Sequence, residues 1–396
     1  MAVAALFLTN GAILANVLPR YPGIKADLDL TNSAYGLAVA AFPAGAMVAG
    51  LTAGVFIRRF RSSRVAVAGT FLVGAGLLGA GLAPSGLTLA IALFLAGSFD
   101  AVVDVAQNAH GLRVQRRYGR SILNSFHAVW SIGAVLGGLM AAGAIALGLS
   151  AGVHLGISAV LFSAVALVVY RFLLPGPDTG ASSSTAPVRP TSQGGSRRYL
   201  IIVALVLIAV GGTIVEDAGN SWAAVYLADS LGAVASVAAF GFIALVGAQF
   251  VGRLIGDRLV DRFGQRAVAR TGGLIAAGGM GLALAFPTVP GTIAGFAAAG
   301  FGVATLVPAA MHAADELPGF RPGTALTLVS WLMRLGFLAS PPIVGVISDA
   351  TSLRTGLLVV PFAGLLALTL AGVLSRRPAT GPARPATAQP VPATTP

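Results

Sequence analysis

The chain lacks cysteine and has few charged residues, and both shortages limit what it can be. With 0 cysteines among 396 residues, it forms neither disulfides nor thiolate metal sites, and cysteine usage leaves its redox compartment open. Charged residues make up 10% of the chain, against about 25% in an average soluble protein. The charges are too few to cover a surface that faces water on all sides.

Hydrophobic residues, in contrast, make up 56% of the chain, and the mean hydropathy is +0.87. Apolar stretches recur along the sequence, and each can cross a hydrocarbon core of about 30 Å as a helix. The alternation of a transmembrane β-barrel is absent. We predict an all-α membrane protein with transmembrane helices at roughly 2–19, 32–57, 65–83, 87–112, 121–147, 153–174, 199–228, 234–257, 267–286, 291–312, 323–347 and 354–375.

The net charge of +12 is distributed in a way that argues against nucleic-acid binding. If successive loops alternate between the two sides of a membrane, twenty of the 25 basic residues fall on one side and three on the other. Basic residues of membrane proteins gather on the cytoplasmic side. We therefore expect a multi-pass protein of the cytoplasmic membrane with both termini in the cytoplasm. The N-terminus, MAVAALFLTN, has no basic region, so no cleavable signal peptide is expected.

Two segments rich in proline, serine, threonine and glycine are unsuited to burying a core. We predict a flexible cytoplasmic linker at 175–198 and a disordered cytoplasmic tail at 376–396. The linker separates two predicted six-helix bundles, residues 1–174 and residues 199–375. Two related bundles with a polar cleft between them form the architecture that alternating access requires.

A repeated loop supports this duplication. The sequences RRFRSSRVAVAG and DRFGQRAVARTG follow the second predicted helix of each half and lie 203 residues apart. The second copy, within GDRLVDRFGQR (256–266), resembles the cytoplasmic loop signature of the major facilitator superfamily, Gly-x-x-x-Asp-Arg-x-Gly-x-Arg, with the glycine one place early. In the first copy, Arg58 stands in place of the acid and Arg61 in place of the glycine.

The resemblance covers about residues 1–375 and implies two pseudo-symmetric six-helix bundles of the superfamily's fold. It also implies a conformational latch in the second half, for which the candidates are Asp257, Asp261, Arg262 and Arg266. More narrowly, LPRYPGIKADL, DVAQNAHG, SFHAVWSIG and SPPIVG look like a bacterial branch near the fucose–proton symporters.

Polar residues interrupt the fourth apolar stretch in GSFDAVVDVAQNAHGL (97–112). Successive helical residues turn by roughly 100°, which places Asp100, Asp104, Gln107 and Asn108 in one sector. A charged side chain at the bilayer centre costs at least about 2.5–3.5 kcal/mol. These residues are expected to line a water-filled cavity; the alternative is a satisfied polar seam between helices.

The seventh and fifth stretches carry similar groups. In GGTIVEDAGNSW, Glu216 and Asn220 share a helix face and Asp217 lies beside it. The paired glycines just before them predict a discontinuous gating helix. In SILNSFHAVWSIG, His127 shares a face with Asn124 and Ser131; histidine titrates near pH 6.5, roughly, and exchanges protons there. A hydrogen-bonded structural histidine is the alternative.

Two arginines also lie within apolar stretches. Arg334 is predicted to share a face with Thr327 and Trp331, and Arg253 with Gln249. Because arginine stays charged, each needs a carboxylate or an anionic substrate. We expect Arg334 to face Asp100 or Asp104 across the cleft.

These observations favour a secondary active transporter of a small polar solute, sugar-like or another metabolite, with proton coupling. The candidates for proton coupling are Asp100, Asp104, Glu216, Asp217 and His127. The candidates for the substrate cavity are Asn10, Gln107, Asn108, Asn124, Ser131, Asn220, Gln249, Arg253, Thr327, Trp331 and Arg334.

Two other functions stay open: proton-coupled export of amphipathic or cationic drugs, and a sensor built on a transporter scaffold. No enzyme motif is present, and neither a cofactor nor a metal is expected. The expected partners are the lipid bilayer, a small-molecule substrate and protons, with the chain acting as a monomer.

Overall fold

The structure is a computed structural model that describes residues 1–119, 122–176, 197–318, 320 and 323–375, and the side chains of Asn124 and Arg197 also lie outside the description. The first half contains α1 (Ala2–Ala15), η1 (Leu18–Arg20), α2 (Tyr21–Asp27), α3 (Asn32–Gly50), α4 (Ala53–Phe60), α5 (Ser62–Gly81), α6 (Gly86–Tyr118), α7 (Leu123–Ala146) and α8 (Ala151–Tyr170). The second half contains α9 (Arg197–Val225), η2 (Tyr226–Ser230), α10 (Ala235–Phe263), α11 (Gln265–Ala285), α12 (Val289–Val303), α13 (Leu306–Asp315), α14 (Thr324–Leu332), α15 (Arg334–Ala350), α16 (Leu353–Gly356), α17 (Val359–Leu370) and η3 (Ala371–Val373). Most of the predicted linker and all of the predicted tail lie outside the described residues.

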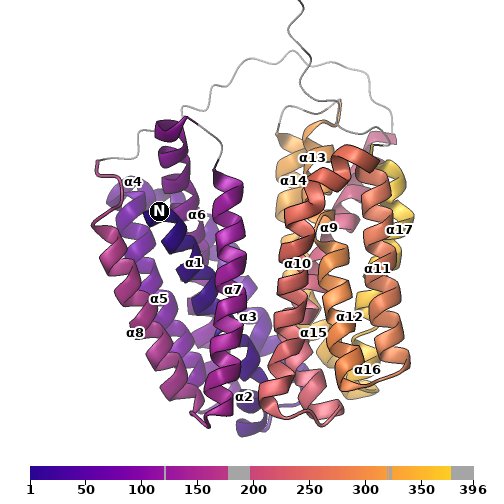
Figure 1. Cartoon of the computed structure of the whole chain (residues 1–396), viewed down its shortest axis with the longest axis horizontal. Helices are drawn as coiled ribbons and strands as arrows, with labels where there is room; N and C mark the ends of the chain where they lie inside the picture. Colours follow the sequence, from indigo (N-terminus) through magenta and orange to yellow (C-terminus); the bar gives the residue numbers. More distant parts are fainter. Residues whose placement is uncertain (120–121, 177–196, 319, 321–322, 376–396) are drawn as a thin grey trace, which may run out of the picture.

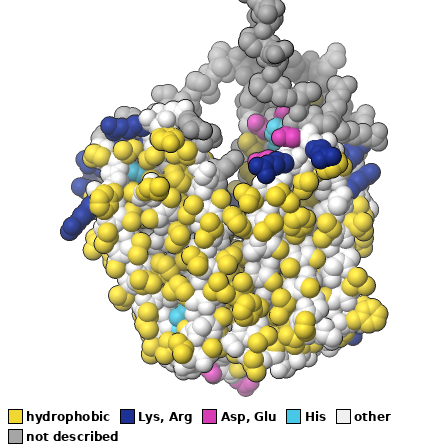
Figure 2. Space-filling model, in the orientation of Figure 1, with side chains coloured by type: hydrophobic (Ala, Val, Ile, Leu, Met, Phe, Trp, Pro, Cys, Tyr) yellow, Lys and Arg dark blue, Asp and Glu magenta, His cyan; other side chains and the backbone are white. Residues whose placement is uncertain are grey.

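The described part of the chain contains twelve helical spans that are long and apolar enough to cross a membrane, which confirms the predicted number. Figure 1 shows α1–α8 and α9–α17 as two groups of helices side by side. Because the number of spans is even, the first span begins and the last span ends at the same end of the molecule, which we call the terminal end; the opposite end is the distal end. Hydrophobic side chains cover much of the visible surface between the ends, and basic side chains gather near the terminal end (Figure 2).

The seventh span corrects one prediction. Helix α9 runs without a break from Arg197 to Val225, so the prediction that Gly211 and Gly212 interrupt it is wrong. A glycine costs a helix only about 1 kcal/mol, and in lipid the backbone groups must bond within the helix. Helix breaks occur instead in the first, tenth, eleventh and twelfth spans, for example between α12 and α13 and between α14 and α15.

The repeated loop has the same backbone in both halves. Gly264 precedes α11 with φ 80° and ψ 155°, and Arg61 precedes α5 with φ 74° and ψ 145°. This region of positive φ suits glycine and strains residues that carry a Cβ. The duplication inferred from the sequence therefore extends to the backbone, and the first half retains the glycine-type conformation with an arginine in it.

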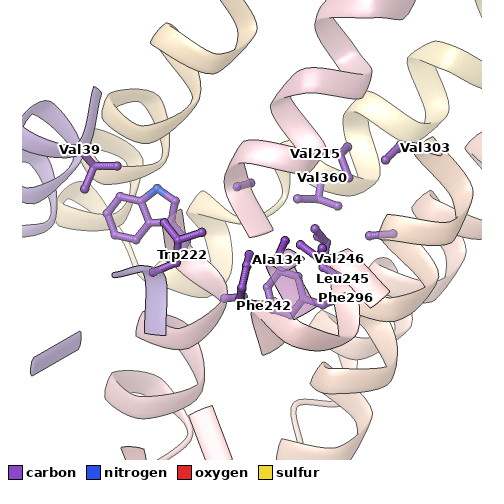
Figure 3. Close-up of a cluster of buried hydrophobic side chains, with 14 of the residues drawn as sticks. Val39, Ala134, Val215, Trp222, Phe242, Leu245, Val246, Phe296, Val303 and Val360 are labelled. Atoms are coloured by element: carbon purple, nitrogen blue, oxygen red, sulfur yellow. The ribbon is translucent and has the colours of Figure 1, made fainter. Parts of the chain in front are cut away.

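A single cluster of buried hydrophobic residues extends across both halves. Figure 3 shows Val39 of α3 beside Trp222 of α9, and Ala134 of α7 beside Phe242 of α10. Each of these pairs joins one half to the other. The halves thus share an apolar contact deep in the molecule, and the polar candidates lie around it.

Candidate functional site

Three polar side chains of the first half form a connected group. Asn108 of α6 donates to Asp104 Oδ1 at 3.0 Å, and His127 of α7 lies 3.2 Å from Asn108 Oδ1 through its Nε2 atom. An amide oxygen only accepts, so Nε2 of His127 is the donor. Asp104 and His127 are exposed on the protein although both lie within membrane spans.

The second half contributes a matching group. Glu216 Oε2 of α9 accepts from Gln249 Nε2 at 2.7 Å and pairs with the Arg253 guanidinium at 3.4 Å. Gln249 is buried, whereas the Arg253 side chain is 40% exposed. The sequence predicted that Arg253 needs a carboxylate, and the structure provides one.

Opposite and like charges of the two halves act on each other over a longer range. Arg334, at the start of α15, attracts the Asp104 carboxylate of α6, whereas Arg253 of α10 repels positive charge on His127 of α7. The predicted pairing of Arg334 with an acid of the fourth span stays a prediction. Among the described residues, Arg334 forms no ion pair within 4.0 Å.

A small pocket lies between the halves next to these groups. Residues of α1, η1, α7, α9 and α10 line it: Gly11, Leu14, Ala15, Leu18, Trp130, Ala134, Glu216, Asn220, Phe242, Val246 and Gln249. The Oδ1 atom of Asn220 is buried and has no hydrogen-bond partner in the described part of the structure. Buried polar atoms are normally bonded, so this oxygen is available to a donor on a ligand.

Asn10 and Asp100 lie beside the pocket. Asn10 of α1 donates to Asp100 Oδ1 at 2.8 Å and accepts from Trp130 Nε1 at 2.8 Å. The Trp130 ring forms part of the pocket wall. Both predicted residues thus belong to the site region, and Trp130 is a pocket residue that the sequence reasoning missed.

Other candidates face elsewhere. Gln107 is buried and donates to the Leu6 carbonyl oxygen at 3.2 Å, so it faces α1 and the predicted cavity position is wrong. The sector of about 100° was wide enough to include a residue that α1 covers. Ser131 is also buried, and its hydroxyl donates to the His127 carbonyl oxygen within α7, so it is not in the cleft either.

Three more candidates have less defined surroundings. Thr327 and Trp331 are exposed near the terminal end of the eleventh span, and neither side chain forms a hydrogen bond with another described residue. The side chain of Asn124 lies outside the description. These three residues stay predictions.

Asp217 belongs to a separate buried cluster. Its carboxylate accepts from the Ser221 hydroxyl at 3.4 Å, and the Ser340 hydroxyl of α15 donates to the Ile214 carbonyl oxygen of α9 at 3.4 Å. Tyr35 of α3 donates to the Ser221 carbonyl oxygen at 2.5 Å, and its ring contacts Trp222 edge-on. Asp217 is therefore placed at the contact between α3 and the second half, away from the solvent-exposed groups.

The predicted latch residues lie at the terminal end. Arg262 stacks over Phe263, and Arg266 donates to the Leu374 carbonyl oxygen at 3.0 Å and to that of Gly372, so it holds the end of its own half. Asp257 and Asp261 are exposed. Neither acid has a hydrogen bond or ion pair with another described residue, and a latch across the halves is not engaged here.

At the distal end, in contrast, an ion pair and hydrogen bonds join the two halves. Lys25 pairs with Asp229 at 2.9 Å. Asp349, at the end of α15, accepts from the backbone N–H groups of Asn32 and Ser33 at 2.9 and 2.8 Å. Together with the bond from Tyr35, these are the hydrogen bonds that join described residues of the two halves. The sequence reasoning identified none of these contacts.

Close backbone packing accompanies these bonds. A Cβ at Gly36 would clash with the Pro341 carbonyl oxygen, and a Cβ at Gly345 would clash with that of Asn32. Helices α3 and α15 therefore touch backbone to backbone at the distal end. The exposed polar groups lie nearer the terminal end, and the tight contacts lie at the distal end. This arrangement indicates a cleft between the halves that opens toward the terminal end.

No cluster of three or more histidine, aspartate or glutamate side chains that could hold a metal ion occurs in the described ranges. The site consists of two polar groups, one from each half, with a pocket between them. The interactions within it are hydrogen bonds and a charge pair.

Comparison with known proteins gives the family. The model of the Major Facilitator Superfamily matches residues 2–259 and 217–395. An uncharacterized transporter of Sinorhizobium fredii (strain NBRC 101917 / NGR234), y4wD, is 31% identical over 380 residues, which are 94% of this chain and 97% of that protein.

Solved structures share the fold at low identity. The crystal structure of a variant of the nucleoside transporter NupG matches with a TM-score of 0.75 at 12% identity, over 94% of this chain and 99% of the other. That of a D-xylose–proton symporter matches with a TM-score of 0.71 at 17% identity, over 95% and 96%. The chain belongs to the Major Facilitator Superfamily and is a multi-pass secondary transporter of the membrane, not an enzyme.

Proposed function

We propose that this transporter moves a small polar solute by alternating access and couples the movement to protons. The observation that carries the proposal is a connected polar group within the membrane spans of each half: Asp104, Asn108 and His127 in the first, and Glu216, Gln249 and Arg253 in the second. Ionisable groups within membrane spans are costly and mark ion and substrate pathways. Acids and a histidine that reach solvent there can take up and release protons.

The orientation we propose follows from the basic residues. Twenty of 25 fall on the side of the termini, and positive loops favour the cytoplasm. With the terminal end in the cytoplasm of the cell, the linker 175–198 and the tail 376–396 are cytoplasmic, and the cleft opens inward. Residues 1–174 and 199–375 then act as two bodies that rock about the pocket, within a monomer.

The pocket supports a substrate that carries hydrogen-bond donors. Glu216, Asn220 and Gln249 are among its lining residues, and Oδ1 of Asn220 is buried without a described partner. Trp130 and Phe242 add aromatic residues to the lining, and aromatic rings suit a sugar-like solute. The resemblance to the fucose–proton symporter branch agrees with a sugar-like solute.

The test uses purified protein in liposomes that contain a pH-sensitive dye. Monosaccharides, polyols and nucleosides are added one at a time outside, and a solute-dependent proton flux identifies a coupled substrate. We expect Asp104→Asn to lower the flux and Asp27→Asn to preserve it, since Asp27 is an exposed acid of α2, outside the cleft.

Other outcomes identify the alternatives. Proton flux induced only by amphipathic cations would replace our proposal with drug export, which the acids of the cleft also suit. Specific solute binding with no flux at all would indicate a sensor. Uptake that ignores the pH gradient would refute proton coupling while leaving the transporter intact.

A further inference from the structure

Asn10 connects an acid of α6 to the wall of the central pocket. Its amide nitrogen donates to Asp100 Oδ1 and its amide oxygen accepts from Trp130 Nε1, each at 2.8 Å. Asn10 is 6% exposed. The next residue, Gly11, touches the Trp130 carbonyl oxygen so closely that a Cβ would clash with it. The bridge is therefore held between two helices in direct contact.

The orientation of the Asn10 amide is determined by its partners. An indole N–H only donates, so the amide oxygen must face Trp130 and the amide nitrogen must face Asp100. Asp100 Oδ1 is consequently an acceptor. The amide cannot turn over without losing both bonds at once.

A proton on Asp100 weakens this bridge on whichever oxygen it binds. A proton on Oδ1 makes this oxygen a donor that faces the donating amide nitrogen of Asn10. On Oδ2 it removes the negative charge, and bonds to ionised acceptors are roughly twice as strong as neutral ones. Either way Asn10 is held less firmly, and so is the indole of Trp130 that bonds to it.

The charges around the two acids of α6 differ. The charged group that acts on Asp100 is Asp104, one helical turn away, and its hydrogen-bond partner from α1 is the neutral Asn10. His127 of α7 and Arg334 of α15 act on Asp104 instead. Asp104 thus has cations to balance its charge, whereas Asp100 has an amide and a like charge.

We propose that Asp100 carries the coupled proton and that Asn10 transmits its binding to the pocket through Trp130. The inference rests on the proposed proton-coupled transport and assigns its proton and its coupling residue. A solvent proton reaches Asp100 past the exposed Asp104, binds a carboxylate oxygen and is released unchanged on the other side. By linkage, a solute that fixes the Trp130 ring changes the proton affinity of Asp100.

Tryptophan fluorescence tests the relay with protons as the probe. The chain has 3 tryptophans, and the variant Trp222→Phe/Trp331→Phe leaves Trp130 as the sole reporter. We expect its emission maximum to shift in a single step as the pH is lowered from about 9 to about 5. The step should disappear in Asp100→Asn and in Asn10→Leu, which has a similar shape and no polar atoms.

Asp104→Asn is the matched control, because it removes the neighbouring acid and leaves the bridge intact. We expect the step to persist there with a changed midpoint. A step that survives both Asp100→Asn and Asn10→Leu, one lost only in Asp104→Asn, or no step in the reporter protein overturns the relay. Should Asp100→Asn fail to fold, Asn10→Leu alone decides.

The relay and the proposed function fail separately. If liposomes show solute-driven proton flux but Trp130 emission does not follow Asp100, the relay is wrong and coupling stands. If the emission follows Asp100 while transport ignores the pH gradient, the coupling is wrong.

Discussion

Replacement of Asp349 by asparagine should open the distal end. In the structure the Asp349 carboxylate accepts two backbone N–H groups at the start of α3, from Asn32 and Ser33. An asparagine has one oxygen for these two donors, and its amide nitrogen meets the second N–H with another donor. One hydrogen bond is lost, and the other becomes weaker because its acceptor is no longer charged.

The structure gives the size of the effect. A hydrogen bond to a charged group contributes about 1.5–3 kcal/mol, and a carboxylate at an exposed helix N-terminus about 0.3–1 kcal/mol. Asp349 is exposed, so solvent screening reduces these values. We expect a loss of about 1–2 kcal/mol, which shifts the equilibrium toward the distal-open state by about 5–30-fold.

The chain's lack of cysteine makes this shift measurable. Val39 is 4% exposed and lies beside Trp222 between the halves, so in Val39→Cys the thiol reacts with a maleimide only when the distal end opens. The labelling rate should rise about 5–30-fold when Asp349→Asn is added and stay constant with Asp27→Asn, which removes a charge from the same end. An unchanged rate in a folded Asp349→Asn protein would refute the reasoning.

Three further predictions follow from single contacts. Arg61→Gly should stabilise the protein by about 1 kcal/mol, because relief of a backbone strain of about 1–3 kcal/mol exceeds the entropic cost of glycine, about 0.5–1 kcal/mol. Denaturant titration measures the change in stability, and Arg61→Ala should leave the stability unchanged. Arg253→Gln should lower proton-driven uptake about fivefold by breaking its exposed pair with Glu216, and Arg253→Lys should restore most of the rate. Gly36→Val should speed labelling of the distal cysteine by keeping α3 and α15 apart, whereas Gly23→Val should not, since nothing lies within 4 Å of a Cβ there.

The fold was readable from the sequence because lipid imposes one requirement on every span. A backbone in hydrocarbon must bond within its own helix, so apolar length alone identifies the spans. The ends of the spans were less predictable. Helix α6 was predicted to end at residue 112 and continues to Tyr118, because a helix need not stop where the membrane does.

The types of residue in the site were predicted more accurately than their exact positions. Helical periodicity placed Asp104 and Asn108 on one face, but it could not show which neighbour covers which flank, so Gln107 was wrongly included. Asp349 was overlooked because an exposed acid at a helix end resembles any loop charge. Its partners are backbone groups more than 300 residues away, which no spacing in the sequence indicates.

The distal contacts have the strength that a coupled carrier needs. When such a carrier changes state, the apolar contacts at one end are exchanged for those at the other. The hydrogen bonds and ion pairs at the ends therefore decide the difference in free energy between the two states. Asp349 contributes about 1–2 kcal/mol by the reasoning above, and the surface pair of Lys25 with Asp229 about 0–1 kcal/mol. One charge crossing a potential of about 100 mV releases about 2.3 kcal/mol. Under the proposed coupling, a single proton therefore supplies free energy of the same order as these polar contacts, whereas several buried ion pairs there would exceed it.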